Sequence, residues 1–256
     1  MALEFKNVSR FFETPSGQFE ALRGIDFKVE EGEFLSIVGP SGCGKSTVLA
    51  IAAGIDKATK GDAFIGGIPV TGPSERVAFM LQKDLLLPWR SIIKNIEFGL
   101  EARNVNKIER RLRAEQELKA CNLDGFDDHF PYQLSGGMRQ RAALARTLAI
   151  DPEIILLDEP FSALDAQTRL LLQDNFAKII KSTNKTTLLI THELTEAVVM
   201  SDRVLVMSER PGSIIAEINI DLPHRGEPLK RRKMPKVSQY VAELFDLLKL
   251  EEMEVN

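Results

Sequence analysis

The chain has 256 residues, a length that suits one large α/β domain or a core with an inserted subdomain. Apolar residues make up 44% of it, and the net charge of −4 gives no general indication of nucleic-acid binding. Two cysteines, Cys43 and Cys121, favour a reducing compartment over a disulfide framework. No run approaches the roughly 18 apolar residues of a membrane span, and the first residues lack a signal-peptide core. We therefore expect a soluble cytosolic protein, in which any membrane role requires a partner.

The first third of the sequence has the character of strands and contains a glycine-rich loop. The apolar run 34–38 predicts a buried strand, and residues 46–53 predict a helix. Between them, residues 39–47 fit the pattern G-x-x-x-x-G-K-[ST]. The glycines let backbone N–H groups surround a β-phosphate, Lys45 neutralises β and γ oxygens, and Ser46 can ligate Mg²⁺. This strand–loop–helix order predicts a P-loop.

From about residue 85 to residue 148 the pattern changes to helix. Residues 107–121 are rich in charge, and Ile108, Leu112 and Leu118 form an apolar stripe along them. We expect the charges to be a solvated face.

A second glycine-rich anion site lies in the same region, where residues 134–141 read LSGGMRQR. Ser135, Gly136 and Gly137 open a helix-forming run, so free backbone N–H groups and the helix dipole favour an anion there. One nucleotide needs only one such cradle. Two of them on one chain predict that ATP is held between two copies of the protein.

Continuously apolar strands return after residue 150, a pattern typical of a parallel sheet covered by helices on both faces. The first of them, 154–157, ends in Asp158 and Glu159, where ligands of open α/β sheets bind. Asp158 is predicted to hold Mg²⁺, and Glu159 to act as general base on the attacking water. The alternative is an acidic strand end that caps a helix or forms a salt bridge.

Three further polar residues follow strands or open helices. Gln82, after the apolar run 77–81, is predicted to reach metal or water, and His192 to donate to a γ-phosphate oxygen. Asp165 is predicted to cap the next helix. A single glutamine or histidine is more often ordinary surface structure. The occurrence of these residues together with the other motifs, in this order, favours a functional role for them.

The last residues form a separate tail. Residues 223–228 read as a turn-rich linker, 230–233 as a basic run, and 237–248 as an amphipathic helix. This helix either docks on its own core or serves a membrane surface or partner. The resulting division is a nucleotide-binding core of residues 1–84 and 151–222, a helical subdomain of residues 85–150, and a tail of residues 223–256.

In their order, these motifs resemble those of the ATP-binding cassette (ABC) ATPases of transporters, over about residues 3–220. The resemblance implies an α/β fold: a RecA-like P-loop NTPase core with N-terminal antiparallel β strands and an inserted α-helical subdomain. It also implies a head-to-tail dimer with two ATP molecules at its interface. Each ATP would be held by the P-loop of one copy and residues 135–137 of the other.

The resemblance implies roles for individual residues. The catalytic residues would be Lys45, Gln82, Glu159 and His192, and Mg²⁺ would be held by Ser46, Gln82 and Asp158. ATP would be bound by Phe12, Gly39, Pro40, Ser41, Gly42, Cys43, Gly44, Lys45, Ser46, Thr47, Ser135, Gly136, Gly137 and Gln140. Phe12 matches the aromatic that stacks on adenine; Phe11 is the neighbouring candidate, and core packing is the alternative for both. Cys43 is expected to react with thiol reagents, with ATP protecting it.

A narrower resemblance lies at residues 81–100, where the sequence LLPWR follows Gln82. It looks like the nitrate, sulfonate and taurine group of bacterial importers, in which this region meets the coupling helix of a membrane subunit. Leu85, Leu86, Leu87 and Trp89 form an apolar cluster that suits an amphipathic helix. Packing within the helical subdomain is the alternative.

The function implied is that of the ATP-binding and ATP-hydrolysing subunit of a bacterial ABC importer. It would energise uptake of nitrate, sulfonate, taurine or a similar small solute. The expected partners are a second copy, an integral-membrane permease that contacts residues 82–89, and a periplasmic or lipoprotein solute-binding protein, with no nucleic acid. The chain would lie at the cytoplasmic face of the membrane, attached through the permease. The alternative is a soluble ABC ATPase without a permease, associated with DNA or ribosomes, although long coiled-coil or basic insertions are absent. A plain P-loop kinase is disfavoured by the second cradle.

Overall fold

The computed structural model describes residues 1–15, 17–162 and 164–248. Its strands are β1 (Leu3–Thr14), β2 (Gly17–Val29), β3 (Phe34–Val38), β4 (Lys60–Ile65), β5 (Ile68–Pro69), β6 (Val77–Met80), β7 (Ile154–Asp158), β8 (Thr186–Ile190), β9 (Arg203–Met207) and β10 (Ile214–Asn219). Its helices are α1 (Lys45–Ala52), α2 (Ile92–Ile96), α3 (Phe98–Ala102), α4 (Lys107–Ala120), α5 (Gly136–Ala149), α6 (Ala166–Thr183), α7 (Leu194–Met200), α8 (Pro228–Arg231) and α9 (Pro235–Leu247), with a 3-10 turn at Pro131–Gln133.

The central sheet has the strand order β10-β9-β3-β8-β7-β6, and only β10 runs antiparallel to its neighbour. All residues of β3, β7 and β8 are buried, as the continuously apolar runs predict for strands covered on both faces. Because these strands are parallel, their carboxyl ends lie at one edge of the sheet. The P-loop, Asp158 and His192 each follow one of these strands and are therefore neighbours in space.

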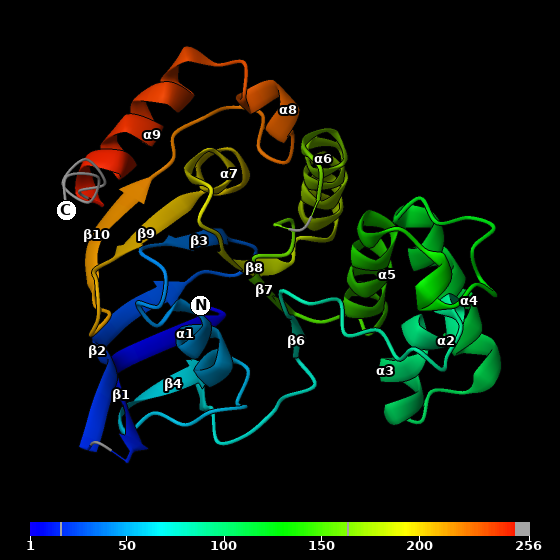
Figure 1. The fold of residues 1–256 in the computed structure, drawn as a ribbon, viewed down its shortest axis with the longest axis horizontal. Coiled ribbons are helices and arrows are strands. Elements are labelled where there is room, and N and C mark those ends of the chain that lie inside the picture. The colour runs from blue at the N-terminus through cyan, green and yellow to red at the C-terminus, as the bar shows by residue number, and fades with distance from the viewer. Residues whose placement is uncertain (16, 163, 249–256) are drawn as a thin grey trace.

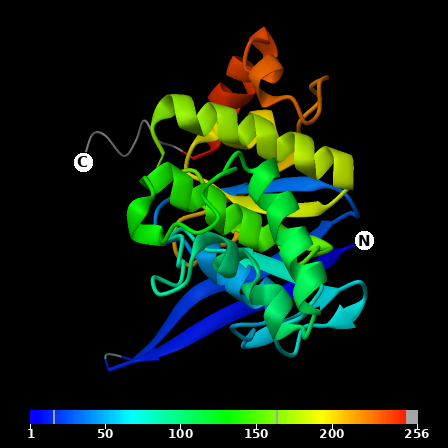
Figure 2. The same cartoon turned by 90° about the vertical axis from the view of Figure 1, so that its right-hand side faces the viewer.

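A second, antiparallel sheet has the order β2-β1-β4-β5. Figure 1 shows α1 between this sheet and the central one, where it contacts β4 and β7. The apolar core between the two sheets includes the stacked rings of Phe5 and Phe27, whose centroids are 4.7 Å apart. The hairpin of β1 and β2 projects from the body at the lower left of Figure 2.

Helices α2 to α5 lie between β6 and β7 in sequence and gather beyond that end of the central sheet (Figure 1). Helix α5 packs against α2, α3 and α4. The buried Asn95 fixes the segment before α2, because its Oδ1 accepts the Leu87 N–H at 2.7 Å and its Nδ2 donates to the carbonyls of Leu87, Arg90 and Ser91.

The predicted apolar stripe of α4 is divided in the structure. Leu118 is buried, together with Ala114, whereas Ile108 and Leu112 are 84% and 55% exposed. Of the three residues of the predicted stripe, only Leu118 therefore packs in the core. Position 108 lies ten residues before Leu118, close to 1000° around a helix of about 3.6 residues per turn, so the two side chains point to different faces.

The tail docks on its own core. Helix α9 packs against α7 through the buried Val237 and Leu244. In the basic run, the Arg231 side chain is only 2% exposed and donates to the carbonyls of Val199, Ser201, Leu222 and Pro223. These include carbonyls at the end of α7 that lack helical partners. Arg231 thus ties α8 to α7.

Candidate functional site

The P-loop connects β3 to α1 and adopts a backbone that exposes its N–H groups. Gly44 is the N-cap of α1, with a φ of 109°, and no side chain caps the helix. The ammonium of Lys45 donates to the carbonyls of Gly39 and Pro40, at 2.8 Å each. The first turn of α1 therefore offers free donors, and the nearest cation is held by the loop itself.

A cleft of about 370 Å³ lies against this loop. It is lined by Ser41, Gly42, Gly44, Lys45, Ser46, Thr47, Glu159 and Arg210. Cys43 is absent from this lining, since its side chain is 1% exposed and packs in the core between the sheets. The reaction of Cys43 with thiol reagents, and its protection by ATP, therefore stays a prediction, and the burial of the side chain counts against it.

Asp158 ends β7 beside the first turn of α1. Burial raises the pKa of its carboxyl, and the neighbouring charge of Glu159 acts in the same direction. A hydrogen bond from the Ser46 hydroxyl lowers that pKa and opposes burial. The pair is a carboxylate and a hydroxyl, both oxygen donors suited to Mg²⁺.

Glu159 is the point at which three predicted residues meet. Its Oε2 accepts from Gln82 Nε2 at 3.1 Å and lies 3.2 Å from His192 Nδ1. Its backbone has a φ of 47°, and its N–H donates to Ile190 O at 3.0 Å. A left-handed conformation is uncommon for a residue other than glycine, and here it follows directly on the end of β7.

The second glycine-rich site lies at the start of α5. The Ser135 hydroxyl accepts the Met138 N–H at 3.3 Å, and both Ser135 and Gly136 are exposed. Residues 135–137 do not line the cleft against the P-loop. This chain therefore does not bring its two phosphate cradles together.

Gln140 lies on the same helix but is buried. Its Nε2 donates to the Gln82 carbonyl at 3.0 Å, while its Oε1 is without a hydrogen-bond partner in the part of the chain that the structure describes. Arg139 bonds Asp84, and Arg146 donates to the carbonyls of Asp84 and Leu85. Gln140 thus belongs to a set of α5 side chains that hold the segment after Gln82.

The two candidate adenine aromatics lie near the hairpin tip and are half-buried. The Arg10 guanidinium is 4.3 Å from the centre of the Phe12 ring, and Lys60 Nζ is 5.5 Å from that of Phe11. Phe12 is paired across the hairpin with Phe19. Neither Phe11 nor Phe12 lines the cleft against the P-loop.

Asp165 caps α6, as expected: its Oδ1 accepts the Thr168 N–H at 2.9 Å.

The sequence analysis missed a polar cluster behind His192. Glu196 is 4% exposed and lines a small pocket together with Glu159 and His192. Burial raises the pKa of its carboxyl, which accepts from Gln173 Nε2 at 2.6 Å. Gln173 Oε1 in turn accepts from Arg232 at 2.9 Å, which links the tail to the helix after His192. No sequence motif marks these residues, because only the packing of α6, α7 and α8 brings them together.

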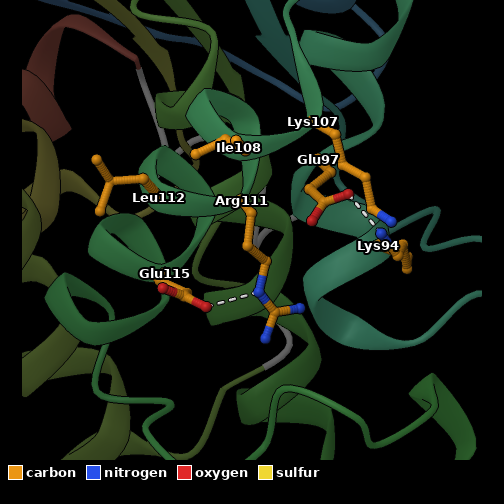
Figure 3. Close-up of a pocket in the computed structure, with 7 residues that line it drawn as sticks. All are labelled: Lys94, Glu97, Lys107, Ile108, Arg111, Leu112 and Glu115. Atoms are coloured by element: carbon orange, nitrogen blue, oxygen red, sulfur yellow. Dashed lines mark hydrogen bonds and ion pairs between the residues drawn. The ribbon is translucent and has the colours of Figure 1, made fainter.

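The helical region carries a groove of about 670 Å³, which we call the helical groove (Figure 3). It is lined by Lys94, Glu97, Lys107, Ile108, Arg111, Leu112 and Glu115. Its charged side chains pair with one another, as between Arg111 and Glu115 at 2.6 Å and Lys94 and Glu97 at 2.7 Å. Ile108 and Leu112 supply its exposed apolar part.

The apolar cluster predicted after Gln82 is divided. Leu85 and Trp89 are exposed, Trp89 by 72%, but Leu86 packs into the core beneath them and Leu87 is half-buried. The prediction of one groove formed by all four is therefore wrong, because Leu86 packs inward and leaves only Leu85 and Trp89 exposed.

A P-loop at the central strand and an acidic pair at the end of the strand two places along define a P-loop nucleoside triphosphatase. Residues 22–162 match the family described as ABC transporter. The chain belongs to this family.

Its relatives match along nearly the whole chain. An uncharacterized ABC transporter ATP-binding protein of Methanocaldococcus jannaschii is 45% identical, over 96% of this chain and 91% of its own length. The taurine import ATP-binding protein TauB of Yersinia pestis bv. Antiqua is 40% identical, over 94% of this chain and 95% of its own length.

A solved ATP-binding cassette, a dimer in a post-hydrolysis state bound to ADP and Pi, superposes with a TM-score of 0.78. It is 33% identical and covers 86% of this chain and 99% of its own. These comparisons confirm the predicted family, the P-loop NTPase fold and ATPase activity. Within the described residues, no helix has the length and apolar character needed to span a membrane.

Proposed function

We propose that this chain is the ATP-hydrolysing subunit of a bacterial importer for taurine or a related sulfonate, or for nitrate or a similar small solute. The names of the relatives support import, since TauB proteins at 38–40% identity cover more than nine-tenths of the chain. The solute would pass through a separate permease and be delivered by a solute-binding protein. The chain would sit at the cytoplasmic face of the membrane, bound to the permease.

The observation that carries the proposal is the meeting of Gln82, Glu159 and His192 beside the P-loop cleft. Glu159 would polarise the attacking water, with Gln82 orienting it, and His192 would donate to a γ-phosphate oxygen. Lys45 would leave its two carbonyl partners for the β and γ oxygens. Phosphoryl transfer of this kind depends mainly on positioning and on stabilising charge.

Mg²⁺ fits the donors that this chain offers. The Ser46 hydroxyl donates a hydrogen bond to the Asp158 carboxyl, so two oxygen donors stand together beside the P-loop. These two residues would hold the ion, with Gln82 as a further oxygen ligand. Bound Mg²⁺ would supply positive charge against the phosphate oxygens.

A second copy of the chain would complete each ATP site. Ser135 and Gly136 are exposed and Gly137 is half-buried at the start of α5, and all three are absent from the lining of the chain's own cleft. In a head-to-tail dimer they would face the γ-phosphate held by the partner's P-loop. ATP would then close the dimer, and hydrolysis with phosphate release would reopen it.

The permease would dock on the exposed apolar side chains of the helical region. Trp89 and Leu85 lie on the segment that follows Gln82, and α5 holds this segment through Arg139, Gln140 and Arg146. Ile108 and Leu112 of the helical groove add apolar surface rimmed by charges. A movement of the docked permease would therefore be transmitted to Gln82 and to α5, whose N-cap residue is Ser135.

The test is expression of the chain with its candidate permease, using an Ile108→Asp variant and an Ile55→Asp control. Ile55 is also exposed, at 66%, but lies in the loop after α1. We expect wild-type and control chains to co-purify with a multi-span membrane protein, and Ile108→Asp to lose it while keeping basal ATPase activity. Retention of the membrane protein by the wild-type chain and by both variants would contradict docking at the groove.

The solute is tested with the assembled complex in proteoliposomes. ATPase activity should rise when the binding protein is loaded with taurine or another sulfonate. A chain that hydrolyses ATP but never associates with a permease would instead favour the alternative of a soluble ABC ATPase.

A further inference from the structure

The turn between β9 and β10 is pressed against the P-loop. Gly212 N donates to Ala21 O at 3.0 Å, and Gly212 O accepts from Arg23 N at 2.9 Å, so the turn is fixed to β2. A Cβ added to Gly212 would lie 2.0 Å from Cys43 O. Only glycine permits this approach, which sets the residue two places earlier, Arg210, beside the loop.

Arg210 bonds directly to the P-loop. Its Nε and Nη2 both donate to Gly42 O, at 2.9 and 2.5 Å. The guanidinium also lies over the Phe19 ring of β2, 4.6 Å from its centre. Arg210 lines the same cleft as Lys45, Ser46 and Thr47.

The charge of Arg210 is not neutralised by an acid. Among residues 1–15, 17–162 and 164–248, no carboxylate forms an ion pair with it, whereas Arg10 pairs with Asp56 and Arg90 with Glu101. A guanidinium has five N–H donors, and Gly42 O engages only two of them. The exposed Arg210 therefore keeps free donors and a positive charge at a cleft built for a polyanion.

We propose that Arg210 is a nucleotide-binding residue that contacts ATP between its base and its β-phosphate. The geometry sets it between the P-loop at Gly42, which lines the cleft, and the hairpin at Phe19, the cross-strand partner of Phe12, which lies outside that lining. The inference rests on the proposed binding of ATP at the P-loop. Because ATP and ADP both carry the base and the β-phosphate, removal of the guanidinium should weaken the binding of both nucleotides equally.

The residue affects binding and leaves the chemical step alone. Its described contacts are Gly42 and Phe19, whereas the proposed base Glu159 bonds Gln82 and His192. Removing Arg210 should therefore raise KM and leave kcat unchanged. Because the charge is exposed, its contribution to ATP affinity should also fall as ionic strength rises.

The experiment compares Arg210→Ala and Arg210→Lys with wild type and an Arg90→Ala control. Arg90 also lies over an aromatic ring, that of Phe98 at 5.2 Å, but in the helical region. Titration with fluorescent ATP and ADP, steady-state kinetics and thermal unfolding are measured for each. We expect Kd for both nucleotides and KM for ATP to rise about tenfold in Arg210→Ala, with kcat and Tm near wild type. Arg210→Lys should recover part of the affinity, since it keeps the charge but not the forked donor pair.

Unchanged nucleotide affinity in a folded Arg210→Ala variant would overturn the proposal. So would a loss of kcat and Tm in parallel with affinity, which is the signature of a purely structural role. If ATP binding weakened while ADP binding stayed normal, Arg210 would contact the γ-phosphate instead, and the proposal would also be overturned. If the wild-type protein did not bind ATP, the proposed function itself would be contradicted. That outcome is distinct from a failure of the Arg210 proposal.

Discussion

Helices α1 and α5 both begin with glycines at an anion site, yet their starts differ. The start of α1 has no side-chain cap, and Lys45, Asp158 and Glu159 surround it. The start of α5 is capped by its own Ser135 hydroxyl, is exposed, and does not contribute to the cleft at α1. The site at the start of α1 is therefore nearly complete within one chain. The start of α5 is an exposed surface, and its ligand must be brought by a partner.

The largest effect is expected from Glu159→Gln, in the cleft at the start of α1. Loss of the base should lower ATP hydrolysis at least about 100-fold. ATP binding should persist, because Lys45, Ser46 and Asp158 remain, and an ATP-bound dimer should accumulate on size-exclusion chromatography. Glu153→Gln is the matched control at the other end of β7, where Glu153 pairs with Arg76. A Glu159→Gln variant with normal turnover would remove Glu159 from the role.

The next effect tests whether the two starts act on one nucleotide from different chains. Lys45→Ala removes the P-loop cation, and Ser135→Arg blocks the α5 start, so each homodimer should be nearly inactive. A mixture should regain part of the wild-type ATPase activity, because each heterodimer contains one intact site. Activity is measured for the separate and mixed proteins at equal total concentration. If mixing restored nothing, the shared site would be contradicted.

A smaller effect is expected from Ser135→Ala. The substitution removes the cap of α5 and should cost about 1 kcal/mol of stability. Asn106→Ala is its control, because Asn106 caps α4 by accepting the Glu109 N–H at 3.0 Å. Both variants should unfold at similarly lowered temperatures, but only Ser135→Ala should weaken ATP-dependent dimerisation. Equal dimerisation in the two would reduce Ser135 to a structural cap.

The smallest effect is expected from Glu196, the buried residue that lines a small pocket together with Glu159 and His192. Its pKa is raised above 4.5 by burial, so the folded state holds the proton more tightly than the unfolded state. Stability from this group is present below pH 4.5 and is lost as the pH rises through the raised pKa. Glu196→Gln should therefore raise Tm at neutral pH, by about 2–4 °C per kcal/mol, with a gain that shrinks toward pH 4.5. The check is thermal unfolding across this pH range; a gain independent of pH would contradict the assignment.

The sequence was sufficient for features that depend on local pattern. The buried strands, the P-loop and the acidic pair after β7 occupy neighbouring residues, so their spacing alone predicts their geometry. The sequence places Gln82, Glu159 and His192 each after an apolar strand, but only the structure shows that Gln82 and His192 both contact Glu159.

Other features depend on how distant segments pack, and no local pattern predicts them. Arg210 reaches Gly42 across 168 residues of chain, and Arg231 is buried although it lies within a basic run. Ile108 stays exposed although α2, α3 and α5 all pack against α4. In each case the residue type is ordinary, and only its tertiary neighbours give it a role.

The two carbonyl bonds of the Lys45 ammonium bear on the affinity of the loop for a nucleotide. With its charge already solvated by Gly39 and Pro40, the loop does not need a nucleotide to satisfy this side chain. A phosphate oxygen that takes this ammonium must replace those two bonds, so part of its attraction for the cation is offset.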